Sequence, residues 1–442
     1  MKRTLSFLAV IGIALAMFVA GSLGPFAPDP TEATSRGSTV SVADLSSPAG
    51  GARGLDATIA VLQAKLVDDP ENSYLLGQLG LAYLTKGRLS SDPSYFPKAE
   101  KLFEQALALD AQNLDAMVGS GLLANAQHRF AEGLGWGKQA SEVSPYDPDA
   151  LGVQVDSLVE LGRYKEASST LQRMVDQKPD LASYSRVAYL RELNGDVAGA
   201  IAAMSLALDA TTVTGDDAGW VRVQLGDLYF NSGRLDQAEE FYGTAAEVAP
   251  ELALTDVGLA RVAAARGDLD EAIELMTPVV ERYPTPQYVS TLGDLYTAAG
   301  DLDAAATQYA LVDVQRKLFA AGGVVPDVEL TVAYADRKLR PAATVKLGKD
   351  QYRARQSVRT ADALGWALYA AGETREAERY AQEALRLGDQ DASYYFHAGM
   401  IASANGDEDR ARRLLERSLD INPYFSVLHA PTARAELDKL TR

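Results

Sequence analysis

A small residue recurs along most of this chain at an almost constant offset. Successive positions are separated by 34, 34, 33, 38, 34, 33, 38, 34 and 34 residues, and they are Ala99, Gly133, Ala167, Ala200, Ala238, Ala272, Ala305, Ala343, Ala377 and Ala411. Self-similarity at this period indicates stacked units, none of which buries its apolar face alone. Most of the chain is therefore expected to form one solenoid of about ten units, although a length of 442 residues alone would suggest two or three globular domains.

Residues around this ladder predict that each unit is a pair of antiparallel helices. Glycine stands five residues before the small residue in seven units, at Gly162, Gly195, Gly233, Gly267, Gly300, Gly372 and Gly406. Glycine closes a helix because it adopts the left-handed conformation at little cost. Aspartate often follows it and is suited to cap the next helix, as in Gly195-Asp196, Gly267-Asp268, Gly300-Asp301 and Gly406-Asp407. Proline ends the second helix twelve residues after the ladder, at Pro145, Pro179, Pro250, Pro284 and Pro423.

The spacing of these residues resembles the tetratricopeptide repeat (TPR). The clearest copy is Leu225-Gly226, Tyr229, Gly233, Ala238, Tyr242, Ala245 and Pro250. Two further copies are Leu292-Gly293, Tyr296, Gly300, Ala305 and Tyr309, and Leu79-Gly80, Tyr83, Ala99, Phe103 and Ala106. The resemblance implies an all-α, right-handed superhelical solenoid of about ten hairpins over residues 72–425, with capping helices at 55–68 and 426–442. It also implies a non-catalytic protein that binds other proteins or peptides.

Four departures from the repeat predict local irregularities. The first hairpin has seven extra residues between Gly80 and Ala99, which are expected to lengthen its internal loop. Insertions fall near residues 211–217 and 320–326. The eighth unit lacks the glycine and contains Pro341, so a bend is expected there.

The N-terminal residues predict export from the cytoplasm. Lys2 and Arg3 precede an apolar run from Leu5 to Ala20, the layout of an export signal. Residues 1–26 are interpreted as a signal peptide or as a retained signal anchor that spans a membrane, and both place the rest of the chain outside the cytoplasm. Residues 27–54 are rich in proline, serine and glycine and are expected to form a disordered linker.

Composition excludes several classes of function. The chain has 60 acidic and 42 basic residues and a net charge of −18, which disfavours nucleic acid as a partner. A basic partner suits this charge, although the excess also serves solubility. There is no cysteine, which excludes disulfides, thiolate metal sites, a cysteine nucleophile and a lipid-modified cysteine.

No catalytic, cofactor or metal site is expected. The three histidines, His128, His397 and His429, fall in separate units, and no zinc-protease, hydrolase or nucleotide-binding motif is present. Residues 133–138 superficially resemble a phosphate loop, but Gly133 belongs to the repeat ladder and no strand is predicted before it. Acidic clusters such as Asp407/Glu408/Asp409 lack the ligand spacing of a calcium loop and are interpreted as helix caps.

The resemblance to TPR proteins also suggests a binding face. In that family the concave groove is lined by about the second, fifth, ninth and twelfth positions of the first helix. These positions correspond here to Tyr189, Trp220, Val223, Asp227, Phe230, Leu254, Arg261, Ser290, Asp294, Asp362, Trp366, Tyr369, Phe396 and Met400. Aromatic and acidic groups together suit a peptide with basic and apolar anchors. The alternative is that some of them, Trp366 above all, pack between repeats. Grooves that hold a partner's C-terminal carboxylate use basic residues, so that activity is disfavoured.

The sequence therefore predicts an extracytoplasmic adaptor of a bacterial cell envelope. Two alternatives remain: a membrane-tethered, self-associating spacer, and an accessory subunit of an envelope enzyme complex.

Overall fold

The computed structural model describes residues 51–326 and 328–441. The predicted signal segment 1–26 and nearly all of the predicted linker 27–54 lie outside this part of the chain. The described residues form α-helices and one short 3₁₀ helix, η1 (Pro93–Tyr95), and they contain no strand. None of these helices is long and apolar enough to cross a membrane.

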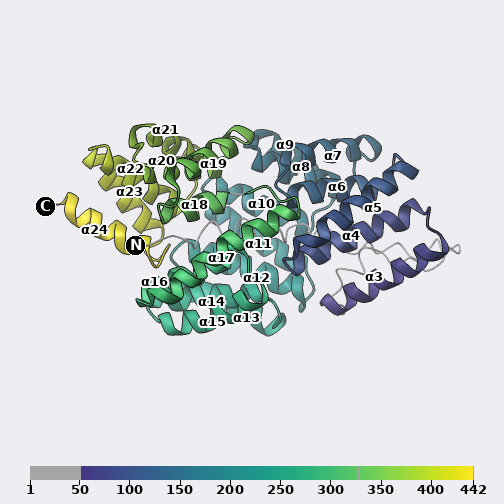
Figure 1. Ribbon diagram of the computed structural model, residues 1–442, viewed down its shortest axis with the longest axis horizontal. Coiled ribbons are helices and arrows are strands. Elements are labelled where there is room, and N and C mark those ends of the chain that lie inside the picture. Colours follow the sequence, from purple (N-terminus) through teal and green to yellow (C-terminus); the bar gives the residue numbers. More distant parts are fainter. Residues whose placement is uncertain (1–50, 327, 442) are drawn as a thin grey trace.

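Ten helical hairpins follow one another along the chain, and in each the first helix is called A and the second B (Figure 1). They are α4 (Ser73–Leu89) with α5 (Phe96–Leu109), α6 (Leu114–Ala126) with α7 (Phe130–Val143), α8 (Pro148–Glu160) with α9 (Tyr164–Gln177), α10 (Leu181–Leu193) with α11 (Val197–Asp209), α12 (Asp216–Asn231) with α13 (Leu235–Val248), α14 (Ala253–Arg266) with α15 (Leu269–Arg282), α16 (Pro286–Ala299) with α17 (Leu302–Ala321), α18 (Val328–Asp336) with α19 (Pro341–Ala354), α20 (Val358–Ala370) with α21 (Thr374–Ala384), and α22 (Ala392–Ala404) with α23 (Glu408–Ile421). Single helices α3 (Gly51–Asp68) and α24 (His429–Leu440) flank them at opposite ends of the long axis. The predicted all-α superhelical solenoid is confirmed.

The residue ladders take the conformations expected of them. All seven glycines that precede the B helices have φ between 73° and 92°, which is the left-handed region. Asp196, Asp268, Asp301 and Asp407 each accept a hydrogen bond from a backbone N–H in the first turn of the following helix. The acidic clusters that contain these residues are thus helix caps, as predicted.

The small-residue ladder is confirmed at nine of its ten positions, which are buried. The prediction is wrong at Ala343, because this residue is exposed. The neighbouring Thr344 is only 2% exposed and takes the buried position. Thr344 is the fourth residue of α19, and Ala238 is likewise the fourth residue of α13. Position within the B helix, and not the small side chain alone, decides which residue meets the A helix.

Aromatic residues of the B helices fit between glycines of two successive A helices. The Tyr242 side chain is fully buried, and a Cβ atom added to Gly226 would lie 2.5 Å from its ring. A Cβ on Gly258, in the next hairpin, would lie 2.4 Å from the same ring. Phe103 packs in the same way between Gly80 and Gly119. Hairpins therefore approach closely because glycine leaves room for a ring between them.

Substituting alanine at two helical glycines should have opposite effects on stability. Gly258→Ala is expected to lower the free energy of unfolding by about 1–2 kcal/mol, because overlap with the Tyr242 ring outweighs the gain in helix propensity. Gly243→Ala should raise it by about 0.5–1 kcal/mol, since nothing lies within 4 Å of its Cβ position. Urea denaturation of both variants checks this, and a stabilising Gly258→Ala would contradict the packing described.

The predicted irregularities are present, in partly different form. The extra residues of the first hairpin extend α4 and form η1, and those near 320–326 prolong α17 to 20 residues. The eighth unit is the most irregular, since α18 has only 9 residues. Pro341 is the first residue of α19, a position where proline suits a helix, and the bend expected at this unit stays a prediction.

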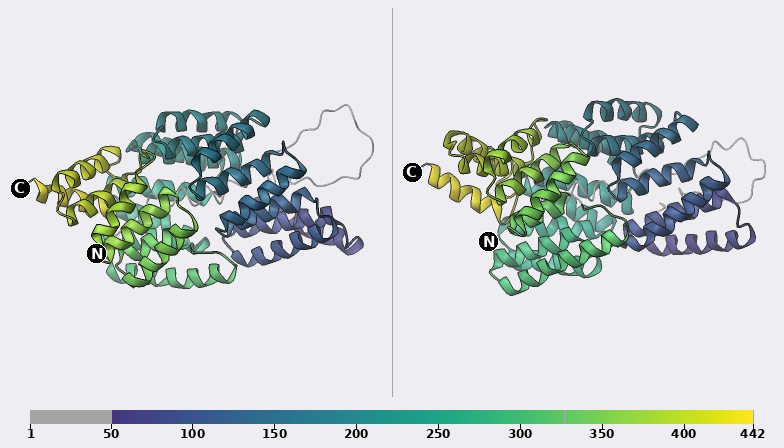
Figure 2. Two further views of the ribbon diagram at one scale, coloured as in Figure 1. Left: turned by 90° about the horizontal axis from the view of Figure 1, so that it is seen from above. Right: turned by 45° about the horizontal axis from the view of Figure 1, so that its top comes forward.

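Contacts between residues 192 to 199 positions apart show that the solenoid closes a full turn on itself. At about 34 residues per hairpin, one turn takes between five and six hairpins. A–B loops of the first turn meet B–A loops of the second, through the pairs Gln127–Gly322, Tyr164–Val358, Gly195–Gly388 and Phe230–Asn422. Figure 1 shows green α19 and α20 beside blue α8 and α9, and both views of Figure 2 show the green helices against the blue and teal ones.

Candidate functional site

The residues predicted to line an exposed groove are for the most part inside the protein. Eleven of the fourteen are buried, with exposures of 1–6%: Trp220, Val223, Asp227, Phe230, Leu254, Arg261, Ser290, Asp294, Asp362, Trp366 and Phe396. The other three are half-buried: Tyr189, Tyr369 and Met400. The expectation that this set lies open to a partner is thus wrong at most positions, and contact of the set with a partner remains a prediction.

The acidic members of this set are paired with a residue about one repeat further along. The Asp227 carboxylate accepts hydrogen bonds from Arg261, at 2.6 Å, and from the hydroxyl of Tyr242, at 2.7 Å. Burial raises the pKa of Asp227, and the charge of Arg261 opposes this rise. Asp156, outside the predicted set, pairs with Arg186 through two bonds of 2.7 and 2.8 Å. These pairs join successive A helices, so their charges stabilise the solenoid wall.

The aromatic members at the C-terminal end pack against histidines. Trp366 stacks on His397 at a centroid distance of 4.2 Å and on Tyr369 at 4.7 Å. The His397 and His429 rings lie 5.9 Å apart. His397 in α22 and His429 in α24 belong to separate units, and their rings nevertheless lie close together. The two residues are 32 positions apart, close to the repeat period, and the period brings such residues side by side.

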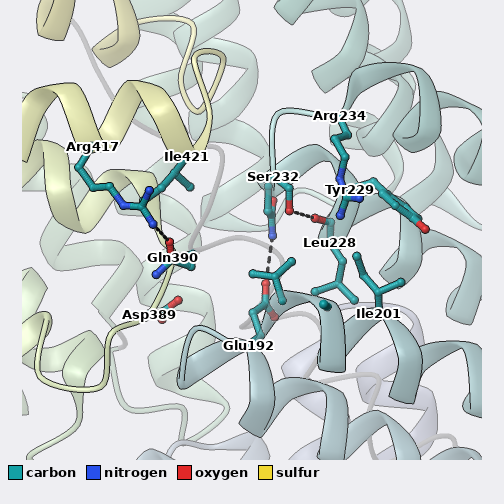
Figure 3. A pocket seen from close by; sticks show the side chains of 13 residues that line it. Glu192, Ile201, Leu228, Tyr229, Ser232, Arg234, Asp389, Gln390, Arg417 and Ile421 are labelled. Carbon is teal, nitrogen blue, oxygen red and sulfur yellow. Dashed lines mark hydrogen bonds between the residues drawn. The ribbon is translucent and has the colours of Figure 1, made fainter.

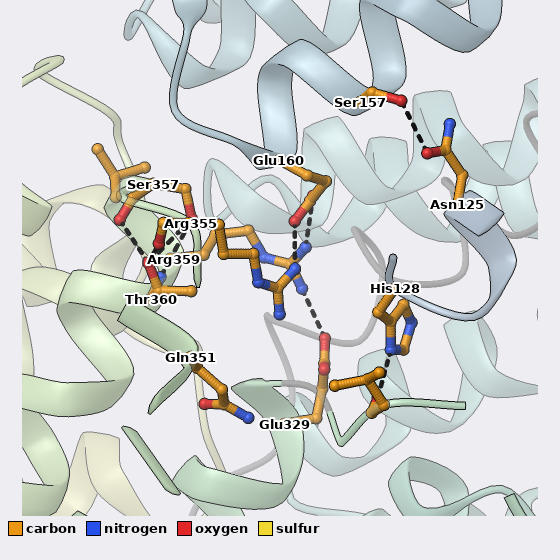
Figure 4. Close-up of polar contacts among 12 residues, drawn as sticks. Asn125, His128, Ser157, Glu160, Glu329, Gln351, Arg355, Ser357, Arg359 and Thr360 are labelled. Atoms are coloured by element: carbon orange, nitrogen blue, oxygen red, sulfur yellow. Dashed lines mark hydrogen bonds and ion pairs between the residues drawn. The ribbon is translucent and has the colours of Figure 1, made fainter. Parts of the chain in front are cut away.

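A buried ionic network joins the two superhelical turns (Figure 4). The Glu160 carboxylate, at the end of α8, accepts from Arg355 at 2.8 Å and from Arg359 at 2.9 Å. Arg359 also donates to Glu329 at 2.6 Å. The side chains of Glu160, Arg355 and Arg359 are 1%, 6% and 4% exposed. Such a network fixes one turn on the other because a buried charge without its partner is costly.

A cleft of about 510 Å³ lies at another place where the turns meet. Figure 3 shows its walls, with Glu192, Ile201, Leu228, Tyr229, Ser232 and Arg234 from the first turn and Asp389, Gln390, Arg417 and Ile421 from the second. Ile201 and Leu228 provide apolar surface. The Arg234 guanidinium lies 4.5 Å from the centre of the Tyr229 ring, and this ring is half-buried.

The cleft contains carboxyl groups whose pKa values are displaced upward. Burial raises the pKa of Glu192 to about 7, and the hydrogen bond from Asn231 only partly offsets this. Burial, with the charge of nearby Asp391, raises the pKa of Asp389 as well. Burial thus disfavours the charged form of both groups, and an approaching cation favours it. The arrangement is thus suited to hold a positively charged group beside an apolar one.

Reasoning from the sequence missed the cleft residues. Glu192 and Tyr229 lie near the ends of A helices, whereas the family pattern directed attention to positions along these helices. Tyr229 belongs to the repeat motif, but no local signal marks either residue as part of a cleft. A pairing of loops about 195 residues apart depends on the angle between successive hairpins, and that angle is not encoded in any short motif.

Comparison with known proteins finds one curated relative and several solved structures that are similar to this chain. The chain is similar to cellulose synthase 1 operon protein C of Komagataeibacter xylinus, with 24% identity over 226 residues, covering 51% of this chain and 14% of the relative. It therefore spans far less than two thirds of that protein's length. Among solved structures, similarity is found to a human IFIT1 dimer, with 17% identity, coverage of 76% of this chain and 79% of that chain, and a TM-score of 0.48. A thermophilic TPR protein of Thermus thermophilus has 23% identity, coverage of 43% and 98%, and a TM-score of 0.39.

A tetratricopeptide-repeat family model matches five stretches of the chain, residues 94–148, 153–212, 223–285, 257–314 and 363–424. The stretch between the last two matches contains the short helix α18, the most irregular part of the solenoid. The matches together cover more than half of the chain, and their hairpins have the glycine, alanine and aromatic contacts described above. The chain belongs to the tetratricopeptide-repeat family.

Proposed function

We propose that this protein is a non-catalytic scaffold that binds a partner protein in the cleft between its two superhelical turns. The observation that carries the proposal is the composition of that cleft, in which Glu192 and Asp389 lie beside the apolar Ile201 and Leu228. A partner segment with a lysine or arginine next to an apolar side chain satisfies both features. TPR proteins in general act as protein-interaction scaffolds, which supports this function over catalysis.

We further propose that the protein acts outside the cytoplasm, in a bacterial cell envelope. The support is the sequence of residues 1–26, in which Lys2 and Arg3 precede the apolar run. An accessory role beside an envelope enzyme is a second form of this proposal. It is favoured by similarity to a protein named for a cellulose synthase operon.

Selection from a random peptide library displayed on phage tests the binding proposal. Peptides retained by the wild-type protein should be enriched in lysine or arginine adjacent to an apolar residue. Their affinity should rise as the pH increases through about 7, because Glu192, whose pKa is about 7, becomes ionised over this range and then attracts the cation. Fluorescence anisotropy of a selected peptide measures both effects.

A charge reversal in the cleft has a matched control on the outer surface. Glu192→Lys should weaken binding of a selected peptide at least tenfold, since it replaces attraction by repulsion. Glu240→Lys, at an exposed position of α13, makes the same change of net charge and should leave the affinity unchanged. Equal affinities for the two variants, or enrichment of acidic peptides, would contradict the proposed cleft.

A further inference from the structure

Three potential metal ligands come together where the last helix meets the solenoid. They are Asp336 at the end of α18, His397 in α22 and His429 at the start of α24. One ligand atom from each lies within 4.8 Å of the other two, and all three residues are buried. None of these three residues lines the inter-turn cleft, so this cluster is separate from the proposed binding site.

The hydrogen bonds of His397 prepare one ring nitrogen as a ligand. Its Nδ1 lies 2.9 and 3.0 Å from the two carboxylate oxygens of Asp362. A carboxylate accepts hydrogen bonds, so Nδ1 carries the hydrogen, and Nε2 of the neutral ring retains its lone pair. His397 is 1% exposed, and its Nε2 has no hydrogen-bond partner among the described residues. A carboxylate that orients a histidine in this way is the usual second layer of a protein metal site.

The other two ligands have suitable geometry. His429 Nε2 lies 3.5 Å from Asp336 Oδ1. Two ligand atoms about 2.0–2.1 Å from a tetrahedral zinc ion are about 3.4 Å apart, so this pair is already spaced to share an ion. The indole N–H of Trp366 donates to the same Asp336 oxygen at 2.8 Å and fixes the carboxylate from the side.

Aromatic packing holds both imidazole rings in place. Trp366 stacks on His397, as described above, and Phe396 stacks on His429 at a centroid distance of 4.4 Å. The rings therefore have little freedom to rotate away. This dry surrounding also limits the number of water molecules that can compete for the ion.

We propose that Asp336, His397 and His429 bind one divalent transition-metal ion, with Zn²⁺ the ion best matched to them. Two imidazoles and one carboxylate are common zinc ligands, and three such ligands leave one position for water. The ligands come from three elements that adjoin at this end of the solenoid. A bound ion thus ties α24 to α18 and α22, and Asp362 is a positioning residue that acts through His397.

Metal binding is tested on the purified full chain after removal of metal with a chelator. Titration with ZnCl₂, followed by calorimetry, should show one ion per chain, and saturation should raise the thermal unfolding midpoint. Titration with CoCl₂ should give the visible absorption bands of tetrahedral cobalt. His397→Gln or His429→Gln should each weaken Zn²⁺ binding at least 100-fold, and Asp362→Asn should weaken it about 10–100-fold.

His128→Gln is the matched control, because His128 is the third histidine of the chain and lies outside the cluster. It should bind Zn²⁺ as the wild type does, and far-UV circular dichroism of each variant confirms that it is folded. A wild-type chain that binds neither Zn²⁺ nor Co²⁺ overturns the proposal, whatever the variants do. Binding that persists unchanged in both His397→Gln and His429→Gln overturns it as well.

Discussion

Replacing Glu160 by glutamine is expected to lower the free energy of unfolding by about 3–5 kcal/mol, the usual cost of removing one partner from a buried ion pair. The shape of the side chain is retained, but Arg355 and Arg359 lose the carboxylate that they share across the two turns. Their guanidinium groups are almost fully buried, so water cannot replace the lost charge. Urea denaturation followed by far-UV circular dichroism measures the loss.

A neighbouring glutamate provides the control for this experiment. Glu166 also pairs with an arginine, Arg163, at 2.5 Å, but the two side chains are 56% and 39% exposed and belong to the same helix end. Surface pairs of this kind contribute about 0–1 kcal/mol, so Glu166→Gln should have little effect. If Glu160→Gln were no more harmful than Glu166→Gln, the ionic network would not hold the turns together.

Substituting alanine for Gly162 should be the second large perturbation. Gly162 has a φ of 74°, and a Cβ atom there would lie 2.2 Å from the backbone oxygen of Gln356, in the second turn. Gly267 has a comparable φ of 92°, but nothing lies within 4 Å of its Cβ position. Both alanine variants incur about 1–2 kcal/mol of backbone strain. Gly162→Ala should lose a further roughly 1–3 kcal/mol, because one turn must move away from the other.

The difference between these two variants isolates the contact between turns. Backbone strain is common to both and cancels in the comparison of their denaturation midpoints. Gly195→Ala offers a repeat of the test, since its Cβ would lie 2.3 Å from the backbone oxygen of Gly388. Equal losses for Gly162→Ala and Gly267→Ala would mean that the turns are apart in solution.

The hairpins could be predicted from the sequence because their determinants are local. Gly267 ends one helix and Asp268 caps the next, and both roles can be predicted without reference to residues further away. The ladder failed only at Ala343, where an alanine next to the true position, Thr344, satisfied the spacing.

The candidate site could not be predicted, because it depends on relations between distant units. Asp227 was chosen as a groove residue from its position in α12, but Arg261 and Tyr242 satisfy its charge from the adjoining helices. Glu192 and Asp389 come together only when the solenoid has completed a turn. Whether these two residues come together depends on many small rotations between successive hairpins. No pattern of residues in the sequence specifies the total rotation.

Closure of the two turns is the central claim, because it brings the two walls of the cleft together. The Val358 amide reports on it directly. Val358 is the first residue of α20, a position with no acceptor inside its own helix, and its N–H donates to the hydroxyl of Tyr164 in the first turn at 2.9 Å. Hydrogen exchange resolved at single amides should find Val358 strongly protected in the wild type and much less protected in Tyr164→Phe. Rapid exchange of Val358 in the wild type, or protection unaltered by Tyr164→Phe, would contradict the closed two-turn structure.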